Sequence, residues 1–194
     1  MNTELLAERA VATPRSPRVR GRLSPVTYRT GTSTDAKALH ALIEENVEVG
    51  RLLPRQLDEL AAHVSRFVVA VRRGQIVGCA ELAPLSGRVS EIRSLVVARD
   101  ARALGIGSAL VAELQLRARV GGFQTLCAFT HDAGYFVRRG FSIVPHVWVP
   151  EKIALDCHRC PQFRRCGQHA VVLTLTSAGR SRAASFVPLD SLRG

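Results

Sequence analysis

The stretch from Glu91 to Leu116, EIRSLVVARDARALGIGSALVAELQL, constrains the fold more than any other part of the chain. It opens with an apolar run that contains Ile92 and Leu95–Val97, and it continues through a polar turn over 98–103. From Ile106 onward, apolar residues recur at the spacing of a helix. The sequence therefore predicts a buried strand, a glycine-containing loop and a helix in direct succession.

The loop between the strand and the helix, Arg102–Ser108, has the pattern R-x-x-G-x-G. Gly105 and Gly107 let the backbone approach a ligand closely, and the helix start adds free N–H groups and the positive end of its dipole. Such a loop suits a phosphate or pyrophosphate, although glycines at this junction can also serve simply to turn the chain. A Walker loop is excluded because no Gly-Lys-Ser/Thr follows, and Leu110 stands where a dinucleotide fingerprint has its third glycine.

The pattern R-x-x-G-x-G after an apolar strand resembles the coenzyme A pyrophosphate loop of the GCN5-related N-acetyltransferase (GNAT) superfamily. A second stretch, Ala133–Phe141, lies where that superfamily has its A-x-x-Y-x-x-x-G-F segment. The resemblance implies an α/β protein with the GNAT fold, a single domain whose mixed central sheet is flanked by helices. It also implies acetyl-CoA as cosubstrate, bound by Leu95, Val96, Val97, Arg102, Gly105, Ile106, Gly107, Ser108, Phe136 and Arg139.

A more specific resemblance is to the short, single-domain bacterial N-acetylglutamate synthases, which begin arginine biosynthesis. It rests on Leu52–Arg55, on Glu91–Val97, and on Val149–Ile153 leading into Asp156–Cys166, and it covers roughly residues 26–175. It implies transfer of the acetyl group of acetyl-CoA to the α-amine of L-glutamate. Other acceptors stay open: glutamine, another amino acid, a small amine or a protein N-terminus.

Acetyl transfer to an amine requires removal of a proton from the ammonium, a polarised thioester carbonyl and a proton for the departing thiolate. The resemblance implies Glu91 as the base, directly or through water, and a backbone amide near the end of the strand for the carbonyl. An ordinary ion pair between Glu91 and Arg93 is the alternative. The usual acid of the superfamily is a tyrosine at the position of Phe136, and Tyr135 points about 100° away from that position on a helix. His131 is the candidate acid, because histidine exchanges protons near neutral pH, although it can also be a plain loop residue.

Period-two alternation places four residues of the central strand on one face: Glu91, Arg93, Leu95 and Val97. Burying a charged pair beside a core strand is costly unless the charges face a cavity or each other. A dicarboxylate substrate suits two cationic clamps, because arginine binds a carboxylate through two parallel hydrogen bonds. Arg93 faces the presumed acceptor site, and Arg55 lies in the loop between the first two predicted helices, which the resemblance implies covers that site. These two arginines are the predicted substrate-binding residues.

Three cysteines within the segment 150–168 have the spacing C-x-x-C-x5-C: Cys157, Cys160 and Cys166. In a chain without a secretory signal, clustered cysteines indicate metal or redox chemistry rather than disulfides. A structural zinc would need a fourth ligand, with His158 or His169 available. Without a metal, these cysteines are packing residues of a loop, whereas Cys79 and Cys127 lie in predicted strands and belong to the core.

The composition fits one globular domain: 194 residues, 46% hydrophobic, with a formal net charge of +11. We expect an Arg/Pro-rich disordered arm at 1–25, a domain at 26–176 and a flexible tail at 177–194.

Apolar runs are too short for a membrane span, so we expect a cytoplasmic protein. We expect its partners to be small molecules, and a homodimer is compatible with the sequence. Nucleic-acid binding is disfavoured, because basic and aromatic residues do not interleave. A non-catalytic module that binds coenzyme A or a metal stays open.

Hydrophobic periodicity predicts the remaining elements of the fold. We expect a hairpin over 67–83 that turns at Arg73–Gly74. The other predicted strands are 26–30, 124–129, 141–144 and 170–175, and the other predicted helices are 35–47, 56–64 and 132–139.

Overall fold

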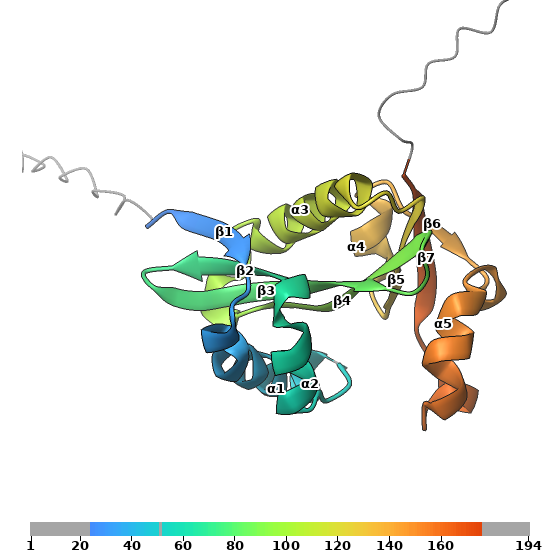
Figure 1. Cartoon of the computed structure of the whole chain (residues 1–194), viewed down its shortest axis with the longest axis horizontal. Coiled ribbons are helices and arrows are strands. Elements are labelled where there is room, and N and C mark those ends of the chain that lie inside the picture. The colour runs from blue at the N-terminus through green and yellow to red at the C-terminus, as the bar shows by residue number, and fades with distance from the viewer. Residues whose placement is uncertain (1–23, 51, 176–194) are drawn as a thin grey trace, which may run out of the picture.

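A computed structural model of the chain describes residues 24–50 and 52–175, without the side chains of 48–50. Most of the predicted arm and the predicted tail lie outside these residues. The described chain forms one seven-stranded sheet in the order β1-β2-β3-β4-β5-β7-β6, with helices on both faces (Figure 1). This confirms the expected single domain with a mixed, helix-flanked sheet.

The strands are β1 (Val26–Thr30), β2 (Phe67–Arg72), β3 (Gln75–Pro84), β4 (Val89–Val97), β5 (Thr125–Thr130), β6 (Ser142–Val144) and β7 (His169–Thr174). The helices are α1 (Ala36–Gly50), α2 (Leu57–His63), α3 (Ile106–Val120), α4 (Ala133–Val137) and α5 (Pro150–Leu155). β4 and β5 pair in parallel, and the other neighbouring strands pair antiparallel. The sequence analysis did not predict α5, a helix of six residues that begins at Pro150. None of the described helices is long and apolar enough to cross a membrane.

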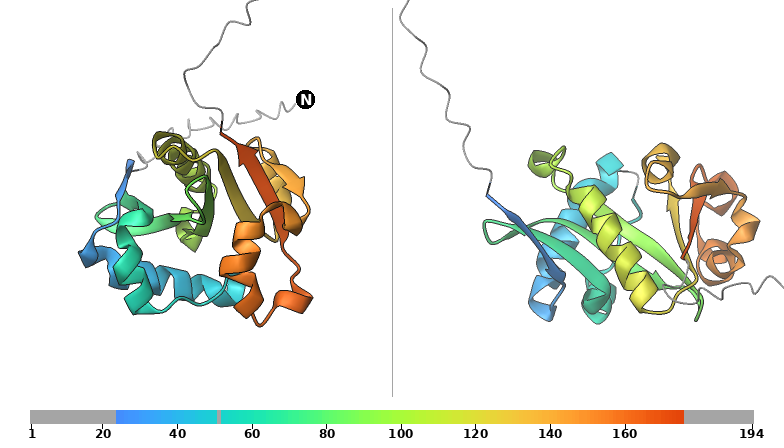
Figure 2. Two further views of the ribbon diagram at one scale, coloured as in Figure 1. Left: turned by 45° about the vertical axis from the view of Figure 1, so that its right-hand side comes forward. Right: turned by 90° about the horizontal axis from the view of Figure 1, so that it is seen from above.

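The core has one layer on each side of the sheet, and β2 contributes to both. Phe67 and Val69 pack with residues of α1 and α2, whereas Val68 and Ala70 pack with residues of α3. Figure 2 shows these two helical layers on opposite faces of the sheet. Burial on both faces explains why β2 is apolar along its first five residues instead of alternating with polar ones.

β4 contains a β-bulge in its second half. Arg93 pairs with Glu81 of β3, and Val96 pairs with Cys79, so β4 has one more residue than β3 between these two pairs. Ser94 lies in this interval with φ of 47°, a left-handed conformation that a non-glycine residue rarely adopts. One extra residue in a strand reverses the faces of all residues that follow it.

The bulge makes the predicted alternation of β4 wrong. Leu95 and Val97 pack against the core on the α3 side, whereas Glu91 and Arg93 form ion pairs with residues of α5 and its C-terminal end. The four residues expected on one face of the strand therefore lie on two different faces. The alternation of faces before the bulge therefore does not predict which face the residues after it occupy.

A charged hydrogen-bond network fixes the start of α1. Asp35, in the short 3₁₀ turn before this helix, accepts a hydrogen bond from the Thr32 N–H at 2.8 Å. Its two carboxylate oxygens also accept hydrogen bonds from the Arg29 guanidinium, at 2.6 and 2.9 Å. The hydrogen bond from Arg29, assisted by those from Thr32, holds the pKa of the Asp35 carboxyl well below its usual range.

We expect Asp35→Asn to lower the free energy of unfolding by about 1–2 kcal/mol at neutral pH, because it removes the carboxylate that caps the turn. Since the pKa is lowered by folding, this stabilisation is complete above the unfolded-state pKa of about 3.9 and is lost as the pH falls below it. Urea unfolding of both proteins from about pH 7 down to about pH 3 measures the difference. Asp100→Asn, at an exposed position on another turn, is the control. A difference that does not shrink with falling pH would contradict the prediction.

Candidate active site

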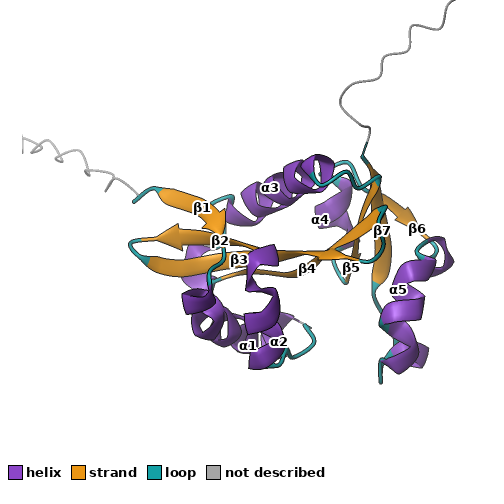
Figure 3. Ribbon diagram, viewed as in Figure 1, coloured by secondary structure: helices purple, strands orange, loops and turns teal. Residues whose placement is uncertain are grey.

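A cavity of about 540 Å³ lies where β4 and β5 stop pairing. Their last pair is Ile92 with Ala128, and the residues that follow on both strands line the cavity. The loop before α2, the start of α3, α4 and α5 complete its walls. In Figure 3, α5 lies at the end of the sheet that carries β5 and β7. The cavity is therefore built from segments that are far apart in the sequence.

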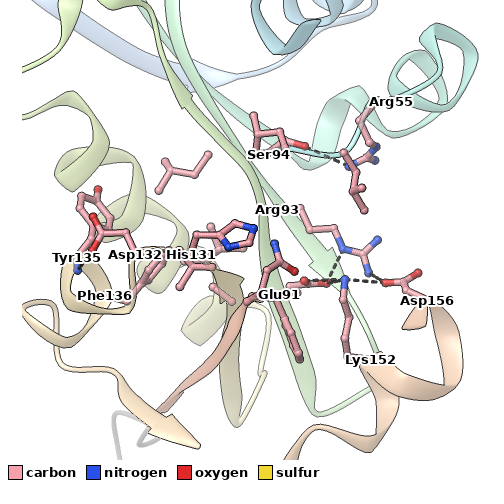
Figure 4. Close-up of a pocket in the computed structure, with 18 of the residues that line it drawn as sticks. Arg55, Glu91, Arg93, Ser94, His131, Asp132, Tyr135, Phe136, Lys152 and Asp156 are labelled. Atoms are coloured by element: carbon pink, nitrogen blue, oxygen red, sulfur yellow. Dashed lines mark hydrogen bonds and ion pairs between the residues drawn. The ribbon is translucent and has the colours of Figure 1, made fainter. Parts of the chain in front are cut away.

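The two ends of the cavity differ in chemistry (Figure 4). At one end, Tyr135 and Phe136 of α4 lie beside Gly107 at the start of α3. His131, just after β5, projects into the space between the two ends. The opposite end is lined by charged side chains: Arg55, Arg93, Lys152 and Asp156.

The start of α3 presents backbone N–H groups without intrahelical acceptors. The first helical hydrogen bond runs from the Ala109 N–H to the Gly105 carbonyl at 3.1 Å, which leaves the N–H groups of 106–108 free for a ligand. Gly105 has φ of 77°, and Ala103 has φ of 64°, a conformation that glycine adopts at lower cost. The loop has the geometry of an anion-binding helix start.

Arg102, predicted to bind the coenzyme, ties this loop to two other elements. Its guanidinium donates hydrogen bonds to the Val97 carbonyl at 3.2 Å and to Asn46 Oδ1 at 2.8 Å. Asn46 is buried on α1, and its amide donates in turn to the Leu42 carbonyl at 2.7 Å. Arg102 therefore holds the loop against β4 and α1, in addition to placing a positive charge beside the loop.

Tyr135 lies against the same loop, although its place on the predicted helix indicated that it points away from the position of the superfamily's tyrosine. A Cβ atom at position 107 would come within 2.8 Å of its hydroxyl, which is buried and has no partner among the described residues. Burial raises the pKa of the Tyr135 phenol, so the hydroxyl stays protonated and able to donate. The Arg139 guanidinium stacks on the ring, 3.5 Å from its centroid, and donates to the Ser108 hydroxyl.

Two carboxylates and two cations form a closed network at the other end. Glu91, only 3% exposed, accepts hydrogen bonds from Arg93 Nε at 2.5 Å and from Lys152 Nζ at 2.8 and 2.9 Å. Asp156 accepts from the same two cations, at 2.9 Å from Lys152 Nζ and from Arg93 Nη2. Each charge of the network is therefore paired with two opposite charges.

Arg55, from the loop before α2, forms a second ionic group at the same end of the cavity. Its guanidinium lies 2.8 Å from the Glu59 carboxylate and 3.0 Å from the Glu81 carboxylate, which is buried on β3. It also donates to the Ser94 hydroxyl at the bulge, at 3.2 Å. The two predicted substrate-binding arginines, Arg55 and Arg93, both line the cavity, and both already hold carboxylates of this chain.

Six of the other twelve predicted catalytic and coenzyme-binding residues also line the cavity, whereas Arg102, Gly105, Ile106, Ser108 and Arg139 do not. The residues that line it are Glu91, Leu95, Val97, Gly107, His131 and Phe136. Val96 does not, because the bulge turns it toward the core formed with α1 and α2. Sequence reasoning missed Lys152 and Asp156 as site residues. Two features of the sequence could have indicated them. They lie four residues apart, a spacing that brings side chains together on a helical turn, and lysine is rare in this chain.

The described residues do not assemble the zinc ligand set that was considered for the cysteine segment. Across residues 24–50 and 52–175, no group of three or more His, Cys, Asp or Glu side chains is placed to hold a metal ion. Cys157 begins one short 3₁₀ turn, and Cys160 and Cys166 each follow such a turn. Cysteine spacing fixes the backbone separation of thiols but not their directions, and the predicted site depended on spacing alone. The predicted burial of Cys79 and Cys127 is confirmed.

Comparison with known proteins gives a consistent result. The profile described as an acetyltransferase (GNAT) domain matches residues 63–143. An uncharacterized N-acetyltransferase of Chlorobaculum tepidum is 32% identical over 147 residues, which cover 76% of this chain and 95% of that protein.

Two longer relatives carry more specific names. The amino-acid acetyltransferase of Neisseria meningitidis is 33% identical over 150 residues, 76% of this chain and 33% of that protein. The crystal structure of N-acetylglutamate synthase from Neisseria gonorrhoeae, complexed with coenzyme A and N-acetyl-glutamate, superposes with a TM-score of 0.70 and 29% identity, over 79% of this chain and 36% of that one. The chain thus spans about a third of the length of these two proteins.

We expect Glu91→Gln to lower the free energy of unfolding by about 3 kcal/mol, because it leaves the partly buried cations Arg93 and Lys152 with only the Asp156 carboxylate between them. Urea unfolding measures the loss. Glu59→Gln is the matched control: its carboxylate also pairs with an arginine of the cavity but is 45% exposed, so its loss should stay below about 1 kcal/mol. Equal losses in the two variants would contradict a structural role for the buried network.

Proposed function

Because the chain belongs to the GNAT family of acetyltransferases, we propose that it transfers the acetyl group of acetyl-CoA to the α-amine of L-glutamate. The observation that carries this choice of acceptor is the gathering of cationic groups from three segments at one end of the cavity, Arg55 before α2, Arg93 on β4 and Lys152 on α5. A dicarboxylate needs two such groups, one for each carboxylate. The product would be N-acetylglutamate, which places the reaction at the start of arginine biosynthesis.

Acetyl-CoA would occupy the end of the cavity that begins at α3. The free N–H groups of 106–108 suit the pyrophosphate of the coenzyme, and the helix dipole adds to their attraction for negative charge. The apolar surface of Leu95, Val97 and Phe136 borders the path from this loop toward the charged end. The neighbouring structure from Neisseria gonorrhoeae, solved with coenzyme A, supports this assignment.

Glutamate would occupy the charged end, with its amine turned toward the coenzyme. The planar guanidinium groups of Arg55 and Arg93 offer paired hydrogen bonds to carboxylates, and Lys152 adds a point charge. Glu91 holds Arg93 and Lys152 in place from beneath, since both of its oxygens accept hydrogen bonds from them. We infer that Glu91 serves the reaction chiefly by positioning these cations, because each of its oxygens is already bound by at least one of them.

Proton transfer then falls to a residue between the two ends. The ammonium loses two protons as the amide forms: one goes to solvent, and one is needed by the thiolate of coenzyme A. We infer that His131 accepts a proton from the acceptor nitrogen and passes it to the thiolate, because it projects into the cavity between the charged end and Tyr135. The Tyr135 hydroxyl, kept protonated by burial, is a second possible donor to this thiolate.

Glutamine is a second candidate acceptor, and one observation favours it. Arg93 and Lys152 already share the carboxylate of Asp156, so the network that would receive a side-chain carboxylate is electrically neutral. The neutral amide of glutamine fits such a network without adding a negative charge.

We expect thiol release from acetyl-CoA to depend on the added amino acid, with glutamate giving the highest kcat/KM among the twenty. A colorimetric thiol assay with the purified full chain, run with each amino acid separately, measures this. Detection of N-acetylglutamate by mass spectrometry confirms the product. Turnover with none of the twenty would contradict an amino-acid acceptor, and coenzyme A binding without any turnover would favour the non-catalytic alternative.

We expect His131→Asn to lower kcat by about a hundredfold, because the variant lacks the group proposed to accept the proton and pass it on. The KM for acetyl-CoA should change little, because His131 lies outside the α3 loop. Steady-state kinetics measure both values, with His40→Asn on α1, outside the cavity lining, as the control. A variant with wild-type kcat would exclude His131 from proton transfer.

A further inference from the structure

Asp156 occupies the position that an acceptor carboxylate would need. Its Oδ2 atom bridges Arg93 Nη2 and Lys152 Nζ, the two cations at the charged end of the cavity. Asp156 itself lines the cavity (Figure 4). The chain therefore binds one of its own carboxylates with the same groups that suit a substrate carboxylate.

The charges of the network leave no excess for a second carboxylate. Glu91 and Asp156 carry two negative charges, and Arg93 and Lys152 carry two positive charges, so the sum is zero. A further carboxylate beside these cations would lie close to that of Asp156, and like charges a few ångströms apart repel strongly where water is partly excluded.

Of the two carboxylates in the network, that of Asp156 is the one that can move away from Arg93 and Lys152. Glu91 is 3% exposed and sits on a central strand, whereas the Asp156 side chain is 37% exposed. Asp156 follows the last residue of α5 with φ of −123° and ψ of −46°, outside helical geometry, and precedes a 3₁₀ turn. Its side chain can therefore rotate toward solvent, whereas the Glu91 side chain is enclosed by the protein.

We propose that Asp156 determines acceptor specificity by competing with the side-chain carboxylate of the acceptor for Arg93 and Lys152. This inference rests on the proposed function, since it assumes an amino-acid acceptor in this cavity. An acidic side chain binds only when Asp156 withdraws. A neutral amide side chain binds with Asp156 in place, because its N–H donates to Asp156 and its carbonyl accepts from a cation.

Removing the charge of Asp156 should therefore favour acidic acceptors selectively. We expect Asp156→Asn to raise the ratio of kcat/KM for glutamate to kcat/KM for glutamine by about tenfold, equivalent to about 1.4 kcal/mol. The change should appear mainly as a lower KM for glutamate. Asp156→Glu, which keeps the charge, should leave the ratio within about twofold of the wild-type value.

Glu151→Gln is the matched control for this experiment. It removes one negative charge from the same helix, at a residue that does not line the cavity, and should leave the ratio unchanged. Circular dichroism and urea unfolding establish that each variant is folded. Calorimetric binding of glutarate, a dicarboxylate without an amine, gives a readout that is independent of turnover. Its Kd should fall by about tenfold in Asp156→Asn.

The outcomes separate this inference from the function on which it rests. Wild-type protein that neither acetylates glutamate or glutamine nor binds glutarate overturns the proposed function, and this inference with it. Turnover of either amino acid, with the same ratio in wild type and Asp156→Asn, overturns the role of Asp156 alone. A ratio that falls in Asp156→Asn also overturns it, because Asp156 would then support the binding of acidic acceptors by orienting the cations.

Discussion

The extra residue in β4 is the constraint on which the rest of the site depends. Before the bulge, this strand directs Glu91 and Arg93 toward α5, and after it the strand directs Leu95 and Val97 toward α3. One strand therefore supplies an ionic wall and an apolar wall to the same cavity within seven residues. A strand of regular alternation would place all four side chains on one face and could not border both ends. The left-handed conformation of Ser94 is the local cost of this arrangement.

The ionic end of the cavity illustrates how buried charge is tolerated beside a core. Each carboxylate and each cation has at least two partners, so no charge is desolvated without compensation. The attraction between opposite charges offsets the desolvation free energy of these groups. As a result, their side chains are held in place before a ligand binds. Preorganised polar groups of this kind discriminate among ligands by charge and shape more than they add affinity.

The features that local pattern controls could be predicted from the sequence: the succession of strands along the chain, the helix after Gly105 and the burial of Cys79 and Cys127. The bulge could not, because one inserted residue does not change the apolar character of a short run. The contact of Lys152 with Glu91 joins residues 61 positions apart, and no local pattern encodes such a distance. The cysteine spacing could not decide whether a metal site forms, because side-chain direction depends on the tertiary fold.

The two ends of the cavity share β4 but differ in the elements that complete them. The α3 end is completed by α4 and by a helix of fifteen residues packed in the main core. The charged end is completed by the segments beside α2 and α5, helices of seven and six residues that have little stability of their own. Changes in these two short helices can therefore alter which amine is accepted while the rest of the domain keeps its shape. The fold separates a fixed half from a half in which new substrate preferences can evolve.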